Sequence, residues 1–234
     1  MNDPLVLIPG LMADARLFLP QMVRLGADRA MLVVLPTRGE TVEQMSEAIL
    51  PALPPKFALL GHGLGGDIAL DLIRRVPDRV TRVILMATDP LPEPPASAAA
   101  REARIARSGR LGQAMREEIP PAALADTEWR AEILALVQDM ALGLGEGAFL
   151  RQSRALQRRP DQQKTMRRVK LPALVIAGAA DTLVPMRRSE FTAGLMPFGK
   201  LQVIAGAGHI ASLEQPEAVC EALEAFLNGP VLLR

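Results

Sequence analysis

The sequence predicts an α/β fold in which one doubly wound, mostly parallel sheet is covered by helices on both faces. Two observations lead to this prediction. Six short apolar runs recur along the 234 residues, with helical patterns between them. Each run is also almost continuously apolar, which is typical of parallel strands that are buried on both faces. A chain of this length suits a single domain with a substantial core.

The predicted strands follow one another at intervals that leave room for helices. They span residues 4–9, 30–36, 56–62, 82–88, 172–178 and 201–206. Helical patterns lie between or after them, at 41–50, 65–75, 187–195 and 216–227. This alternation of strand and helix indicates parallel crossover units rather than hairpins.

One long segment interrupts the alternation. It opens with "LPEPPASAAA" (91–100), whose prolines predict a connector, and continues with helical patterns at 99–117, 127–142 and 146–158. About 80 residues without a strand are too many for one crossover. We therefore predict a helical cap at 91–170, inserted after the fourth strand into a core formed by 1–90 and 171–234.

Composition and charge argue against several classes of protein. The formal charge of +1 offers no electrostatic reason to expect a nucleic-acid partner. The apolar run near the N-terminus is too short for a signal peptide, and none reaches the roughly 18 residues that span a bilayer. The sequence has no cluster of Cys and His and no phosphate-binding loop motif. We expect a cytoplasmic protein without a metal site, cofactor or membrane partner.

Candidate functional residues follow the predicted strands. In a doubly wound sheet such residues gather at the carboxyl ends of strands. The first strand is followed by Leu11, and the third runs into the turn "GHGLGG" around Gly63. The fifth strand is followed by Asp181 and the sixth by His209. The order along the chain is therefore glycine-rich turn, acid, histidine.

These four elements resemble the α/β-hydrolase family. That family carries a nucleophile elbow, G-x-S-x-G, between a strand and a helix, with the acid and the histidine later in the sequence. Here "GHGLGG" (61–66) matches at every position except the nucleophile, where Gly63 replaces serine. "GAAD" (178–181), "GAGH" (206–209) and the tail "GHIASLEQPEAVCEALEAFL" are similar to the family's acid, histidine and final helix. The resemblance covers nearly the whole chain.

The resemblance implies a role for each matching residue. His209 would be the general base and acid, and Asp181 would orient its imidazole. The backbone N–H groups of Leu11 and Leu64 would form the oxyanion hole. Asp89, which ends an earlier strand in "MATDP", is the alternative acid.

The glycine at position 63 leaves three interpretations open. The elbow backbone has a positive φ, which costs a non-glycine residue roughly 1–3 kcal/mol and costs glycine little. Gly63 could be an inactivating substitution, engineered or recent, in a hydrolase that otherwise uses serine. His209 and Asp181 could instead act as a base without a covalent step, as in cofactor-free lyases and oxygenases that resemble this family. The third interpretation is a non-catalytic protein that binds a small molecule.

Substrate and partners are predicted from the inserted segment. Its Ala, Leu and Met content predicts an apolar pocket, which suits a small carboxylic ester or thioester. The chain is similar to compact bacterial esterases, among them methyl esterases that act on acyl-carrier-protein substrates. Arg151, Arg154 and Arg158 share one helical face, which could receive an acidic carrier protein or could simply face solvent. No pattern predicts an oligomeric state.

Overall fold

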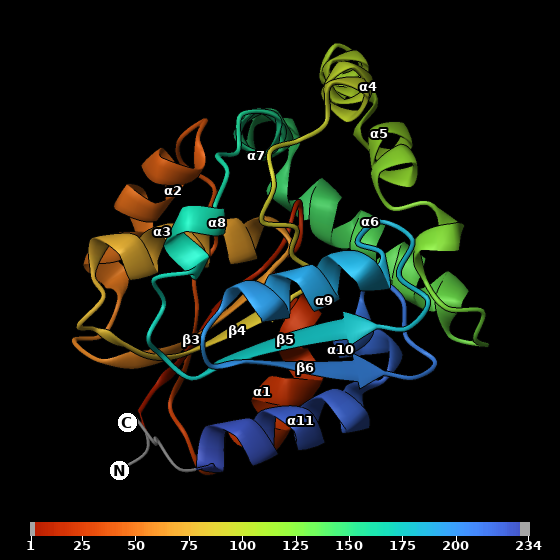
Figure 1. The fold of residues 1–234 in the computed structure, drawn as a ribbon. Helices are drawn as coiled ribbons and strands as arrows, with labels where there is room; N and C mark the ends of the chain where they lie inside the picture. The colour runs from red at the N-terminus through yellow and green to blue at the C-terminus, as the bar shows by residue number, and fades with distance from the viewer. Residues whose placement is uncertain (1–2, 230–234) are drawn as a thin grey trace.

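A computed structural model describes residues 3–229 and contains all six predicted strands (Figure 1). The strands are β1 Leu5–Ile8, β2 Met31–Val33, β3 Phe57–His62, β4 Val80–Met86, β5 Ala173–Gly178 and β6 Gly199–Ile204. They form one sheet in the order β2-β1-β3-β4-β5-β6. Every neighbouring pair is parallel, so all carboxyl ends meet at one edge.

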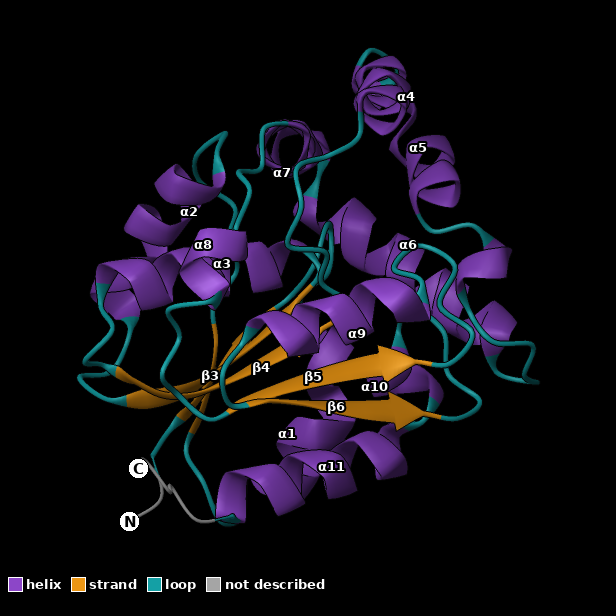
Figure 2. Cartoon of the chain, viewed as in Figure 1, coloured by secondary structure: helices purple, strands orange, loops and turns teal. Residues whose placement is uncertain are grey.

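Helices cover both faces of the sheet (Figure 2). They are α1 Leu19–Leu25, α2 Val42–Ile49, α3 Leu64–Arg75, α4 Pro95–Ile105, α5 Leu111–Glu118, α6 Arg130–Leu144, α7 Glu146–Gln157, α8 Gln163–Met166, α9 Met186–Leu195, α10 Ala211–Glu214 and α11 Pro216–Asn228. α2, α3 and α9 lie on one face, and α1 and α11 lie together on the other. The doubly wound architecture is confirmed.

The alternation of side chains along each strand divides the core into two apolar clusters. Leu5 and Leu7 belong to the cluster beneath α1 and α11, whereas Val6 and Ile8 belong to the cluster beneath α2, α3 and α9. Residues two apart on a strand share a face, so an all-apolar strand supplies both clusters. The edge strand β6 departs from this prediction, because Gln202 and Val203 on it are exposed. β6 has a neighbour on only one side.

The helices differ from the sequence prediction in several places, and the short helices α8 and α10 were not predicted. α1, with the 3₁₀ turn Ala15–Phe18 before it, was not predicted at all. The proline-rich connector already contains the start of α4, at Pro95. Proline is tolerated in a first helical turn because its missing N–H has no intrahelical partner there. The helix predicted at 99–117 is two helices, separated by a 3₁₀ turn at Ser108–Arg110.

The helices between β4 and β5 pack onto the rest of the molecule. α4, α5 and α7 lie above the sheet in the view of Figure 1. Met115, Val137 and Phe149 from this insertion belong to the same apolar cluster as Leu7 and Leu17. Within residues 3–229 no single helix is long and apolar enough to cross a membrane; α6 and α7 meet that criterion only when counted together, across a bend of 104°.

Candidate active site

Gly63 occupies a tight turn between β3 and α3. Its φ is 51° and its ψ is −117°, a conformation that L side chains rarely adopt. The Gly63 N–H donates to the Met86 carbonyl at 2.9 Å, and the Gly63 carbonyl accepts from the Gly66 N–H at 2.9 Å. The positive φ predicted for this position is present, and backbone hydrogen bonds to β4 and α3 hold the turn in place.

The space around Gly63 differs from the space around its neighbouring glycines. A Cβ on Gly65 would lie 2.0 Å from the Ile8 carbonyl oxygen, and one on Gly61 would lie 2.2 Å from the Gly65 carbonyl oxygen. At Gly63 the nearest atom to a Cβ would be Gly10 Cα, at 3.8 Å, which is an ordinary contact. Close packing therefore requires the flanking glycines, whereas position 63 has room for a side chain.

His209 and Asp181 form a buried pair. His209 Nδ1 lies 3.0 Å from Asp181 Oδ2. The other carboxylate oxygen, Oδ1, accepts from the N–H groups of Leu183 at 2.8 Å and Val184 at 3.0 Å. Because a carboxylate only accepts, the His209 ring donates from Nδ1, which in the neutral imidazole leaves Nε2 as an acceptor. The structure brings these two predicted residues together.

Glu214 holds the loop that carries His209, and sequence reasoning missed it. Its Oε2 accepts from the N–H groups of Gly208 at 2.8 Å and Ala125 at 2.7 Å, and its Oε1 accepts from Ile210 at 2.8 Å. The residues on both sides of His209 are therefore fixed by one buried carboxylate. The only sequence signal was an acidic residue five positions after the histidine.

His62 packs against His209 and also lines the cavity described below. It is buried, and its Nε2–H donates to the His209 carbonyl at 2.9 Å. The two imidazole rings meet edge to face, with centroids 5.2 Å apart. Burial, reinforced by the proximity of His209, lowers the pKa of His62 to about 4, so this ring is neutral at physiological pH.

The loop after β1 carries the other candidate oxyanion donor. Met12 has a positive φ of 54°, and its N–H donates to Gln152 Oε1 at 2.7 Å. Gln152 lies on α7, is fully buried, and also donates to the Pro36 carbonyl at 3.0 Å. Among residues 3–229 the Leu11 N–H has no acceptor. Gln152 is a second residue that sequence reasoning missed.

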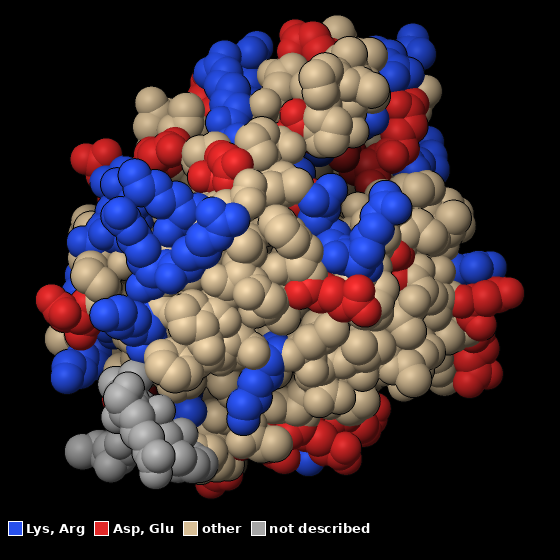
Figure 3. Space-filling view, in the orientation of Figure 1, with Lys and Arg blue, Asp and Glu red and all other residues tan. Residues whose placement is uncertain are grey.

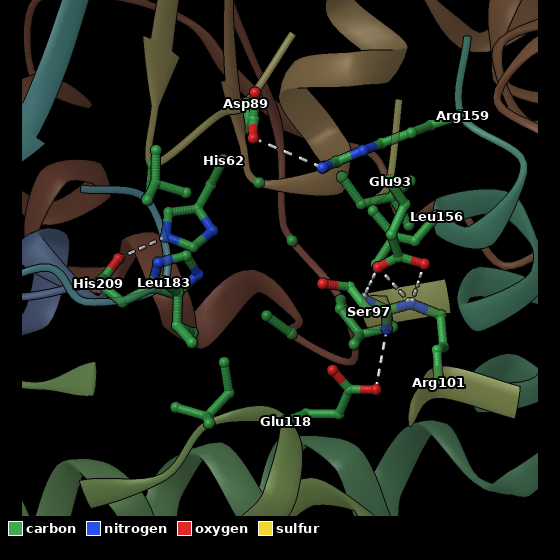
Figure 4. A pocket seen from close by; sticks show the side chains of 18 of the residues that line it. His62, Asp89, Glu93, Ser97, Arg101, Glu118, Leu156, Arg159, Leu183 and His209 are labelled. Atoms are coloured by element: carbon green, nitrogen blue, oxygen red, sulfur yellow. Dashed lines mark hydrogen bonds and ion pairs between the residues drawn. The ribbon is translucent and has the colours of Figure 1, made fainter. Parts of the chain in front are cut away.

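A cavity of about 470 Å³ opens above the turn (Figure 4). Gly63, His209, Leu11 and Leu64 all line it, whereas Asp181 lies behind His209. The lining is mixed: apolar side chains such as Val137 and Leu156, of the kind that the sequence predicted, stand beside charged ones. Five arginines and four carboxylates contribute to it: Arg101, Arg104, Arg159, Arg187, Arg188, Asp89, Glu93, Glu117 and Glu118. Overall composition of the insertion did not show which side chains face inward.

The alternative acid, Asp89, has other partners. One of its oxygens accepts from the Leu91 N–H at 3.1 Å. The other lies 3.3 Å from Arg188 Nε and 3.7 Å from an Arg159 terminal nitrogen. The structure thus pairs Asp181, and not Asp89, with His209.

Two arginines of the predicted row contact the segment between β2 and α2. Arg151 Nε donates to the Thr37 carbonyl at 2.7 Å, and Arg158 lies 3.9 Å from Glu40. Figure 3 shows a larger basic surface over α8 and the adjoining end of α3. Exposed Lys164, Arg167, Arg168 and Lys170 belong to this part of the chain.

Comparisons with known proteins agree with the geometry. The model of the alpha/beta hydrolase family matches residues 5–222. The chain is 30% identical to a pimeloyl-[acyl-carrier protein] methyl ester esterase of Aromatoleum aromaticum, over 83% of each chain. It is also 30% identical to one of Xanthomonas axonopodis pv. citri, over 95% of this chain and 94% of the other.

Solved structures show the same fold. A thermophilic esterase from Thermogutta terrifontis superimposes with a TM-score of 0.87 at 23% identity, covering 97% of this chain and 90% of that one. An enol-lactonase from Burkholderia xenovorans gives 0.84 at 20% identity, covering 98% and 93%. With the elbow, the buried His209–Asp181 pair and the family match taken together, the chain belongs to the α/β-hydrolase family.

Proposed function

We propose that this chain is a carboxylic-ester hydrolase whose active form carries serine at position 63. In that form the serine is the nucleophile, His209 the general base and acid, and Asp181 the residue that orients His209. The N–H groups of Leu11 and Leu64 bind the oxyanion, and α4–α8 form a cap over the cavity. With glycine at position 63 the chain lacks the attacking group.

One observation carries this proposal: position 63 has the backbone of a nucleophile elbow and the room for a side chain. A serine there would meet no atom closer than 3.8 Å to its Cβ, and it would sit in the wall of the cavity that His209 also lines. The positive φ makes any non-glycine residue strained by roughly 1–3 kcal/mol, a cost that active sites commonly bear.

The geometry supports an acyl-transfer sequence in the serine form. His209 Nε2 takes the serine proton as Oγ attacks the ester carbonyl, and Asp181 stabilises the imidazolium. The oxyanion then accepts from Leu11 and Leu64, next to the positive end of α3. His209 returns the proton to the leaving alcohol or thiol, and water repeats the cycle on the acyl-enzyme. Loss of the nucleophile alone lowers kcat by on the order of 10⁶.

The substrate class follows from the relatives. Two 30% identical relatives are named for a methyl ester carried on acyl-carrier protein, which supports esters or thioesters of an acyl chain, free or carrier-bound. An acidic carrier would be attracted by the exposed cations near α8, such as Lys164 and Arg168. Turnover of carrier-bound esters should then fall as salt rises, whereas turnover of free esters should not.

Three proteins test the proposal: the unmodified chain, Gly63→Ser and Gly63→Ala. Alanine adds the same Cβ and the same backbone strain as serine but no hydroxyl, so it is the matched control. Each is assayed against short p-nitrophenyl esters and acyl thioesters. We expect several orders of magnitude more hydrolysis from Gly63→Ser than from either other protein. A folded Gly63→Ser protein that is no faster than Gly63→Ala would refute the serine-hydrolase proposal.

The retained His209–Asp181 pair favours a second candidate, base catalysis without a covalent step. His209 Nε2 could then take a proton from a bound substrate or water. Activity in the unmodified chain that disappears on His209→Ala would support this candidate. Ligand binding without turnover in every form would instead support a non-catalytic binding protein.

A further inference from the structure

The wall of the cavity carries more positive than negative charge. Two of its arginines are neutralised locally, because Arg101 and Arg104 contact Glu93 and Glu118 at 2.7–2.8 Å. Figure 4 shows Arg101 held between these two carboxylates. Glu117 pairs with Arg107, which does not line the cavity. Three arginines and a single carboxylate then remain in the lining: Arg159, Arg187, Arg188 and Asp89.

The contacts among these four residues are loose. Asp89 lies 3.3 Å from Arg188 and 3.7 Å from Arg159, longer than the charge-assisted hydrogen bonds of about 2.7–2.9 Å that such groups make when engaged. The buried Nε of Arg159 has no hydrogen-bond partner. Arg187 is exposed and has no partner among residues 3–229. Arg159 Nε and the Arg187 guanidinium therefore lack an acceptor within residues 3–229.

A further acidic residue, Asp67, lies behind the cavity wall but does not balance the positive charge of the arginines. Asp67 is 1% exposed, and one of its oxygens is 4.0 Å from Arg159. Neither of its oxygens accepts a hydrogen bond. Burial raises the pKa of Asp67 to about 7, despite the opposing effect of Arg159, so its carboxyl is only partly charged at neutral pH. A bound anion would give the terminal nitrogens of Arg159 and Arg188 closer acceptors than the loose contacts that they now make.

We propose that Arg159 and Arg188 bind a carboxylate of the substrate, so that the preferred ligands are half-esters of dicarboxylic acids. A carboxylate matches the planar fork of an arginine, and two guanidiniums beside one acid leave a positive charge for it. The reaction of such an ester at position 63 rests on the proposed function, but the binding does not require serine. The unmodified chain should therefore show the same selectivity.

Calorimetric titration of the unmodified protein tests the inference. The ligands are half-esters from monomethyl succinate to monomethyl suberate, each compared with its dimethyl ester, which has almost the same length and no charge. We expect the best half-ester to bind at least about tenfold more tightly than its diester, and this preference to shrink as salt rises. Equal affinities for half-ester and diester throughout the series would overturn the proposal.

Three variants locate the selectivity. Arg159→Gln and Arg188→Gln should each remove most of the preference for the half-ester. Arg110→Gln, which removes the same charge from an exposed position outside the cavity, should leave it intact. Asp89→Asn should strengthen half-ester binding, because it removes the competing carboxylate and keeps an acceptor for Leu91.

The outcomes separate this inference from the proposed function. A preference that survives both cavity variants, or that falls equally in Arg110→Gln, refutes the carboxylate site. Weaker half-ester binding in a folded Asp89→Asn protein does so as well. Hydrolysis by the Gly63→Ser form without any preference for half-esters would leave the hydrolase proposal standing and overturn this one alone. If Gly63→Ser shows no hydrolysis and the unmodified chain shows no preference for half-esters, both proposals are refuted.

Discussion

Replacing Asp67 by asparagine should stabilise the protein, and the gain should depend on pH. Burial raises the pKa of Asp67 from 3.8 to about 7. Each pKa unit corresponds to 1.36 kcal/mol, so the folded state disfavours the ionised carboxyl by about 4 kcal/mol. Below about pH 4 the carboxyl is protonated in both the folded and the unfolded state, and burial of Asp67 costs no ionisation energy. As pH rises to about 7, the free energy of unfolding falls, because only the unfolded state ionises. Asparagine is neutral throughout and avoids that loss.

The pKa shift of His62 has the opposite effect on how stability depends on pH. Burial lowers its pKa from 6.5 to about 4, so the fold favours the neutral ring. Its contribution of about 3 kcal/mol is complete above pH 6.5 and is lost as pH falls towards 4. Between about pH 4 and pH 6.5 the two residues oppose each other. In this range the two residues together should therefore change the free energy of unfolding of the unmodified protein very little.

Urea unfolding at intervals from about pH 4 to about pH 8 tests the pair. The free energy of unfolding of Asp67→Asn, relative to the unmodified chain, should rise by up to about 4 kcal/mol across this range and then level off. His62→Gln keeps a donor for the His209 carbonyl and should show the opposite slope below about pH 6.5. Asp78→Asn, at an exposed position, is the control. A constant difference between Asp67→Asn and the unmodified protein at all pH values would refute the reasoning.

Three further substitutions test the supports of the site. Gly65→Ala should destabilise the fold by several kcal/mol more than Gly63→Ala, because the Cβ at position 65 would lie 2.0 Å from a carbonyl oxygen. Thermal unfolding measures the difference, and equal melting temperatures would contradict the packing argument. Glu214→Leu leaves three N–H groups without an acceptor, so amide hydrogen exchange should become faster on both sides of His209. Glu214→Gln should give an intermediate rate. Unchanged exchange in both variants would show that the loop does not depend on Glu214. In the Gly63→Ser form, Gln152→Leu should lower kcat about tenfold or more with a smaller effect on KM, since it releases the Met12 N–H beside the oxyanion donor. An effect on KM alone would assign Gln152 to substrate binding.

Sequence reasoning found the parts of the site that local patterns encode. Gly63, Asp181 and His209 each follow an apolar strand, and parallel strands bring their carboxyl ends to one edge of the sheet. Glu214 and Gln152 have no such signal. Their hydrogen bonds join residues 89 and 140 positions apart, to Ala125 and Met12, and only the folded chain creates them.

The charged side chains of the cavity lining were missed for a related reason. An insertion rich in alanine and leucine predicts an apolar lining, but several of its apolar side chains, such as Met115 and Phe149, pack into the core cluster and do not line the cavity. Arg101, Glu93 and Glu118 are left to face the cavity, where they neutralise one another. Helix α1 escaped prediction because its buried residues, Gln21 and Leu25, are too few for a clear periodic stripe.

Backbone strain around the cavity bears on how Gly63 should be interpreted. Within residues 3–229 two non-glycine residues have positive φ: Met12 at 54° and Ala87 at 48°, the latter in the cavity lining. Such residues cost of order 1–3 kcal/mol each, and such strain clusters at functional sites. Met12 sits beside Leu11, the oxyanion donor that we propose, and Gln152 holds it in place. A protein that only binds small molecules has no use for strain in the loop after β1 or for a buried His209–Asp181 pair beside the cavity. Backbone strain beside Gly63 and the His209–Asp181 pair favour the hydrolase that we propose over a binding scaffold.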